Sequence, residues 1–123
     1  MTIIGAINLV DGIKPNGYGV EEKVRWLSAL DGTVKSELHD RYMNGVQEEF
    51  FGYGEHTPLT QELLAAHPYD EIYIRWLEAQ IDYASGEYEK YNNSISLFNA
   101  VYAAYEKYYH RTHTPKGKGF VHF

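Results

Sequence analysis

Cysteine is absent from the 123-residue sequence. A disulfide scaffold, a thiolate zinc site, a cysteine nucleophile and an iron–sulfur cluster are therefore excluded together. Long apolar runs are absent as well, since none approaches the ~20 residues that a transmembrane helix needs. The first residues, Met1 to Ile4, lack the basic and apolar regions of a signal peptide. We therefore expect neither a membrane span nor a secretory leader.

Positive charge is scarce. The chain has 11 Lys and Arg residues against 17 Asp and Glu residues, a net charge of −6. A free-standing nucleic-acid binder is expected to be basic, because its affinity comes from neutralised phosphates. Fifteen of the acids fall between Glu21 and Glu89, whereas the last segment, from Arg111 to Phe123, has three basic residues and no acid. The sequence therefore predicts an acidic body with a small basic tail.

Tyrosine is abundant, with 12 residues in the chain. Its ring is large and apolar, its hydroxyl is polar, and it loses little rotamer entropy when it is ordered, so it suits partly hydrated interfaces. A tyrosine-rich core would explain the same count. Both interpretations stay open at this level.

Helical spacing dominates the first third of the chain. Apolar residues at Ile3, Ile7 and Val10 predict a short helix between Thr2 and Gly12, with a turn after it. A longer amphipathic helix is predicted from Val20 to Arg41, because its apolar residues recur every three or four positions.

The middle of the chain, Asn44 to His67, is predicted to be a long connection, since it contains three glycines and a proline. Val46 to Tyr53 fits a short strand or a packed loop, and Thr60 to Ala66 fits two helical turns. A connection of this length in a small domain is usually functional or partly mobile.

Two further helices are predicted in the last third. Pro68 and the acids after it are typical of a helix start. A turn is predicted at Gly86, and a helix that continues through Gly86 is the alternative, because the apolar pattern carries through it. A long Tyr-rich helix follows from Glu87 to Arg111, with apolar residues on more than half of its circumference. A helix covered in this way is either central in its own domain or shared with another subunit. The predicted fold is therefore all-α, a small bundle of three to four helices.

The chain is predicted to divide into a helical domain, residues 1–113, and an extended C-terminal tail, residues 114–123. Pro115, Gly117 and Gly119 end the helical pattern, and the tail has an apolar tip. Such a tip is a candidate docking peptide, and folding back onto its own core is the alternative. The candidate partner-interface residues are Lys116, Lys118, Phe120, Val121 and Phe123 in the tail, with Tyr102, Tyr105 and Tyr109 on the last helix.

Chemical motifs are few. The sequence has no phosphate-binding glycine loop, no paired Glu-x-x-His motif of a di-iron bundle and no recognisable nucleophile motif. His110 and His113 are three residues apart, but a metal site needs further ligands. We therefore expect no catalytic residue, no metal and no cofactor, and the residues alone predict an acidic, tyrosine-rich helical interaction protein.

A set of short segments resembles a known family. The chain is similar to small head–tail connector proteins of the adaptor, or head-completion, type from tailed phages and prophages of Gram-positive bacteria. The resemblance extends from about Ile13 to Pro115. The segments that carry it are Lys14-Pro15-Asn16, Glu22-Lys23, Trp26-Leu27, Leu30-Asp31-Gly32, Pro68-Tyr69-Asp70-Glu71, Leu77-Glu78-Ala79-Gln80-Ile81-Asp82-Tyr83-Ala84, Gly86-Glu87, Tyr91-Asn92-Asn93-Ser94, Phe98-Asn99, Tyr102, and Tyr108-Tyr109-His110-Arg111-Thr112-His113 with Pro115.

The resemblance implies a structural virion protein at the head–tail junction, made in the bacterial cytoplasm. Such proteins assemble as a ring, usually dodecameric, under the portal protein. They extend the DNA channel without binding DNA specifically, and they present a surface to the next neck or tail-completion protein. The family has no catalytic residues to carry over. Three alternatives remain at this stage: a different neck or tail component of mixed α/β fold, a cytosolic helical interaction or regulatory module with no virion role, and a small enzyme.

Overall fold

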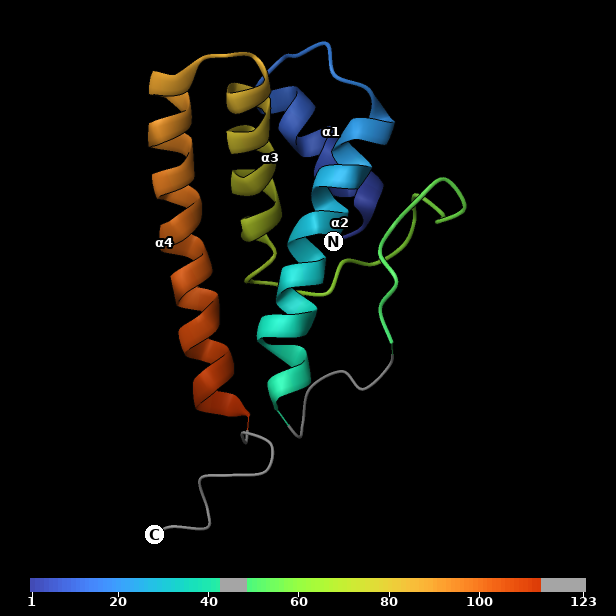
Figure 1. The fold of residues 1–123 in the computed structure, drawn as a ribbon, viewed down its shortest axis with the longest axis vertical. Coiled ribbons are helices and arrows are strands. Elements are labelled where there is room, and N and C mark those ends of the chain that lie inside the picture. Colours follow the sequence, from blue (N-terminus) through green and yellow to red (C-terminus); the bar gives the residue numbers. More distant parts are fainter. Residues whose placement is uncertain (43–48, 114–123) are drawn as a thin grey trace, which may run out of the picture.

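The computed structural model describes residues 1–42 and 49–113. Within these ranges the chain forms four α-helices and one 3-10 turn, and the predicted all-α fold is confirmed. The elements are α1 (Ile3–Ile13), α2 (Val20–Glu37), the 3-10 turn η1 (His39–Arg41), α3 (Glu71–Ala84) and α4 (Tyr88–Thr112). Figure 1 shows α3 between α4 and α2, with α1 beside α3 and α2. The predicted extended tail, residues 114–123, lies outside the described residues.

The first helix confirms the spacing prediction. Thr2 caps it, since the Thr2 hydroxyl accepts a hydrogen bond from the Gly5 backbone N–H at 3.0 Å. The buried face of α1 packs against α2 and α3. That face consists of Ile3, Ala6, Ile7 and Val10.

The second helix is shorter than predicted. It begins at Val20, as expected, but ends at Glu37 and not at Arg41, and residues 39–41 wind as a 3-10 turn. The predicted continuation of the helix to Arg41 is therefore wrong. The tighter turn places His39 in the core, 2% exposed, with its ring stacked on Tyr109 of α4 at 5.0 Å. Tertiary contact with α4 outweighs the local helical pattern here.

The prediction of two helical turns from Thr60 to Ala66 is also wrong. This segment pairs its backbone with the start of the chain instead. The Ile3 N–H donates to the Gln61 carbonyl at 3.0 Å, and the Leu63 N–H donates to the Met1 carbonyl at 2.9 Å. These long-range bonds satisfy backbone groups that a helix would otherwise pair locally. Residues 49–53 contain no strand, and the rest of the predicted Val46–Tyr53 segment lies outside the described residues.

The predicted turn at Gly86 is confirmed. Helix α3 ends at Ala84, and α4 begins at Tyr88, one residue after the predicted start. Gly86 has φ +74°, which an L-residue with a side chain adopts only at a cost. The turn makes α3 and α4 an antiparallel hairpin, in which the two helices lie side by side (Figure 1).

Replacing Gly86 with alanine should destabilise the protein by about 1–2 kcal/mol, because the left-handed backbone penalises a Cβ. Gly32 provides the matched comparison. It lies inside α2 with open space where a Cβ would be. Gly32→Ala should therefore stabilise the protein by up to ~1 kcal/mol. Urea unfolding followed by circular dichroism measures both changes, and equal shifts in the two variants would contradict the prediction.

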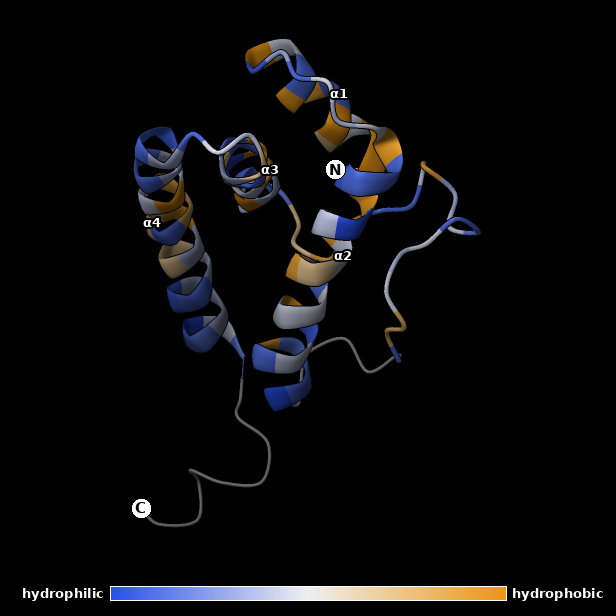
Figure 2. Ribbon diagram, turned by 45° about the horizontal axis from the view of Figure 1, so that its top comes forward, coloured by the Kyte–Doolittle hydropathy of each residue, from blue (hydrophilic) through white to orange (hydrophobic). Residues whose placement is uncertain are grey.

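Apolar side chains from all four helices form one core. In Figure 2 the hydrophobic colour is strongest on α1 and on parts of α2 and α3, whereas the C-terminal third of α4 is coloured hydrophilic. Tyr105 and Tyr109 nevertheless lie in the core, 2% and 5% exposed. Hydropathy ranks tyrosine low because of its hydroxyl, although its ring is buried here. The tyrosine-rich core weighed from composition is therefore part of this fold.

Candidate functional site

Helix α4 has one face that none of the other helices in residues 1–42 and 49–113 covers. Among the four helices α4 packs against α3, and its outward face from Asn92 to Ala104 is exposed. No charged residue occurs between Tyr91 and Tyr105. The exposed residues on this face are small or uncharged, namely Asn92, Asn93, Ser96, Leu97, Asn99, Ala100, Ala103 and Ala104. We call this set the outer α4 face.

The outer α4 face is unusual for an acidic chain. Its largest apolar side chain, Leu97, is 51% exposed. Small side chains allow a second helix or a flat surface to approach the α4 axis closely. The absence of charge along the face removes the main desolvation cost of covering it. This face is therefore suited to protein contact.

The three predicted interface tyrosines lie on the other side of α4. Tyr105 and Tyr109 are buried within the chain, and Tyr102 is half-buried. Burial is the main cause that raises the pKa of Tyr102 to about 12, with Glu106 and Glu37 adding to the shift. In this conformation Tyr105 and Tyr109 contribute to the fold of the single chain. The other predicted interface residues, Lys116, Lys118, Phe120, Val121 and Phe123, lie outside the described residues.

An aromatic cluster joins the C-terminal ends of α2 and α4. The Tyr109 ring stacks on His39 and, at 3.7 Å, on His113, and Tyr42 meets Tyr109 edge-on. The His39 Nε2 and the Tyr105 hydroxyl are 3.1 Å apart and hydrogen bonded. His39 Nδ1 is buried with no hydrogen-bond partner within residues 1–42 and 49–113. The cluster therefore holds a histidine whose second ring nitrogen is unsatisfied.

Burial lowers the pKa of His39 from its ordinary value of 6.5 to about 4. The nearby charges of Lys35 and His113 contribute to this lowering of the pKa, and the charge of Asp40 opposes it. A neutral imidazole suits this site, because a second N–H at Nδ1 would have no acceptor there. No sequence pattern singles out this histidine, since it follows an apolar helix face in an ordinary charged segment.

A second buried polar group, Asp31, holds the long connection to α2. Asp31 is fully buried and accepts three hydrogen bonds, from the Tyr53 hydroxyl at 2.5 Å, the Tyr73 hydroxyl at 2.7 Å and the Leu64 N–H at 3.0 Å. The Tyr73 hydroxyl in turn accepts from the Ala65 N–H at 2.7 Å. Burial raises the pKa of the Asp31 carboxyl, and the hydrogen bonds partly offset that rise. In the sequence, Asp31 belongs to one of the segments that resemble the adaptor family, and no pattern there marks it as a buried acceptor.

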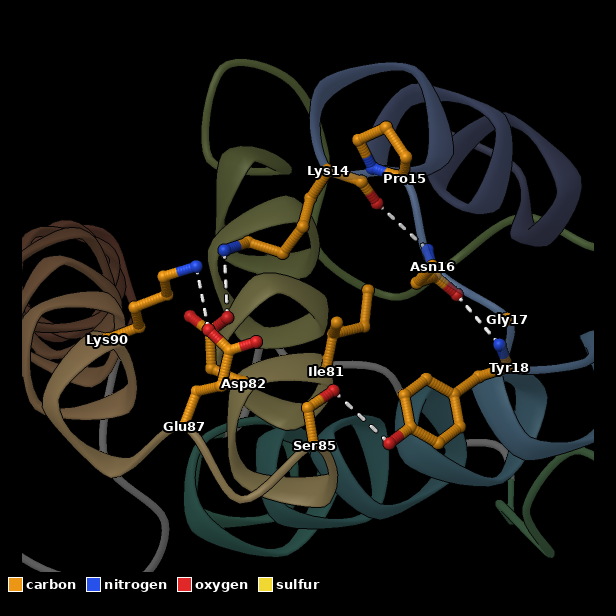
Figure 3. A pocket seen from close by; sticks show the side chains of 10 residues that line it. All are labelled: Lys14, Pro15, Asn16, Gly17, Tyr18, Ile81, Asp82, Ser85, Glu87 and Lys90. Carbon is orange, nitrogen blue, oxygen red and sulfur yellow. Dashed lines mark hydrogen bonds and ion pairs between the residues drawn. The ribbon is translucent and has the colours of Figure 1, made fainter.

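A polar pocket of about 410 Å³ lies beside the α3–α4 turn (Figure 3). Lys14 donates to the Asp82 carboxylate at 2.8 Å, and Lys90 pairs with Glu87 at 2.7 Å. The Tyr18 hydroxyl lies 3.2 Å from the Ser85 hydroxyl and is hydrogen bonded to it. Each charge that lines this pocket therefore has a partner of opposite sign. These contacts hold the Lys14–Tyr18 turn against α3. No unpaired charge in the lining is left to recognise a ligand.

A different groove, of about 520 Å³, lies between the start of α2 and the connection. Its wall includes Val20, 43% exposed, and Leu59, 39% exposed, with the buried Val24 behind them. Its other lining residues are Glu21, Arg25, Tyr53, Gly54, Glu55 and Thr57. We call it the α2 groove.

The described part of the chain contains neither a group of metal-ligating side chains nor a membrane-spanning helix. No group of three or more His, Asp or Glu side chains there is arranged to hold a metal ion. The His113 ring stacks on Tyr109, and the His110 ring lies 5.4 Å from the Tyr42 ring. No helix within residues 1–42 and 49–113 is both long and apolar enough to cross a membrane.

Comparison with known proteins gives no relative from which to transfer a role. No protein-family model matches the chain, and searches of the curated proteins and of the solved structures give no match.

Proposed function

We propose that this protein is a structural subunit of a phage or prophage head–tail connector, which assembles as a ring under the portal protein. The resemblance of its segments to the adaptor family supports the specific role. The outer α4 face supports the more general role of a subunit that contacts other proteins, because it offers an uncharged, exposed surface along a long helix. This face is the single observation that carries the proposal.

The charge of the body supports the same role. Removing the two tail lysines from the eleven basic residues leaves nine against seventeen acids, a net charge of −8 for residues 1–113. A ring of such subunits would have an acidic wall. An acidic wall repels DNA phosphates, so DNA would pass through the channel without adhering to it.

The outer α4 face gives the proposal its sharpest test. Ala100→Glu with Ala104→Glu puts two charges in the middle of the face, at exposed helix positions that tolerate Glu. If the face is covered in the ring, burying these charges should lower incorporation into virions at least about tenfold. Quantitative mass spectrometry of purified particles from a complemented deletion strain measures incorporation.

Ala29→Glu is the matched control, because Ala29 is an exposed alanine on α2. It should fold as the double variant does and enter virions normally. Circular dichroism confirms that both are folded. Normal incorporation of the double variant would contradict the assignment of the outer α4 face to the ring.

A pull-down of the tagged chain from cells producing the phage or induced prophage tests the class of protein. Recovery of portal and neck proteins supports the connector role. Recovery of one host protein at fixed stoichiometry, with no virion component, would replace it with the cytosolic interaction module.

A further inference from the structure

The α2 groove has the chemistry of a site for a short basic peptide with an apolar tip. Val20, Val24 and Leu59 give it an apolar wall. Glu21 and Glu55 line it, and neither carboxylate forms an ion pair within the described residues. Arg25 is the one basic residue of the lining, so the groove has a net negative charge.

The chain itself contains a segment of matching composition. Residues 114–123 read Thr-Pro-Lys-Gly-Lys-Gly-Phe-Val-His-Phe, with two lysines, no acid and three large apolar side chains at the end. We propose that this tail docks in the α2 groove of a second copy of the chain. Phe120 and Val121 would contact the apolar wall, and Lys116 and Lys118 would face Glu21 and Glu55.

The length of the tail indicates whether it can bind the groove of its own chain or only that of a second copy. The tail starts after His113, whose ring contacts Tyr42 beyond the C-terminal end of α2. The groove lies at the opposite end of that helix, at Val20 and Val24. From Val24 to Glu37 alone, α2 rises about 20 Å.

Seven fully extended residues from His113 to Phe120 span at most about 25 Å. Most of this length is needed to cover the distance along α2. The remaining few ångströms are too short for the path around the helix to the side of the connection (Figure 1). Lys116, three residues after His113, reaches only about 11 Å and cannot meet Glu21 of its own chain. With Lys116 and Lys118 facing Glu21 and Glu55, the occupant is therefore the tail of another copy.

Such a contact joins copies head to tail, which is the interface type that closes into rings. The inference rests on the self-association contained in the proposed function, but it does not depend on the phage role. It can be tested on purified protein alone.

The experiment measures binding of a fluorescein-labelled peptide, residues 113–123, to the full-length chain by fluorescence anisotropy. Saturable binding is expected. Replacing Phe120 and Phe123 in the peptide by alanine should weaken binding at least about tenfold, because the apolar anchors are lost. On the protein, Val20→Asp should weaken it similarly, and Glu21→Lys with Glu55→Lys should do so at low salt and less at 0.5 M salt.

Matched controls lie outside the groove. Leu9→Asp changes an exposed apolar residue of α1, and Glu37→Lys reverses an exposed charge at the far end of α2. Both should bind the peptide as the unmodified chain does. Absence of saturable binding, or equal binding by the Val20→Asp and Leu9→Asp variants, would overturn the inference. Loss of binding only in the Ala100→Glu, Ala104→Glu variant would place the tail on the outer α4 face and also overturn it.

The two proposals fail in distinguishable ways. Peptide binding without any virion protein in the pull-down would retain the tail contact and remove the connector role. Virion incorporation without peptide binding would retain the connector role and remove the tail contact.

Discussion

Asp31→Ala should destabilise this protein by about 3–5 kcal/mol, a large share of the 5–15 kcal/mol that holds a typical domain together. The substitution leaves the Tyr53 and Tyr73 hydroxyls and the Leu64 N–H without their acceptor in a buried site. Each unsatisfied buried donor costs about 1–3 kcal/mol.

More conservative substitutions in this network should lower the free energy of unfolding by smaller amounts. Asp31→Asn keeps one acceptor oxygen for two of the donors and should cost about half as much as the alanine variant. Tyr53→Phe removes one donor of the three and should cost about 1 kcal/mol. Glu37→Ala is the control, because this carboxylate is exposed on the same helix, and its effect should stay within ~0.5 kcal/mol.

Urea unfolding at neutral pH measures these free energies, and hydrogen exchange shows where they act. In the Asn and Phe variants the amides of Leu64 and Ala65 should exchange faster, since Asp31 and Tyr73 bind them in the native chain. An Asp31→Ala variant as stable as the Glu37→Ala variant would show that the network does not hold the connection.

Lowering the pH from 6.5 to 4 should remove up to about 3 kcal/mol of stability through His39 alone. The folded protein keeps this imidazole neutral, since its pKa is about 4 in the core and 6.5 when exposed. Between these values the unfolded chain binds a proton that the folded chain does not. The free energy of unfolding therefore falls as the pH falls through this range. Above it, His39 has no effect on the free energy of unfolding. Below it, His39 causes no further loss.

His39→Gln tests the effect, because glutamine does not titrate and can still hydrogen bond to Tyr105. Protonation of carboxylates contributes to both proteins, so the difference in slope between the native chain and the variant isolates His39. His56→Gln is the matched control at an exposed histidine. Urea unfolding at several values between pH 4 and 7 gives the slopes. Parallel curves for the native chain and His39→Gln would contradict the prediction.

Local patterns determined most of the helical content from sequence. The recurrence of apolar residues placed α1, α2 and α4 within a few residues of their observed bounds, and Gly86 marked the turn between α3 and α4. These features depend on spacing along one helix or on one backbone angle, so the sequence alone contains them. Composition likewise established the acidic body of the chain.

Tertiary structure decided what the spacing could not. The end of α2 and the extended course of residues 60–66 depend on partners far away in sequence, namely Tyr109 and the first residues of the chain. Which tyrosines of α4 are buried, and which face remains exposed, depends on the side that meets α3 and the aromatic cluster. Asp31 and His39 became visible as buried groups only when their distant partners were in place, because burial and hydrogen bonding are properties of the packed chain and not of any local segment.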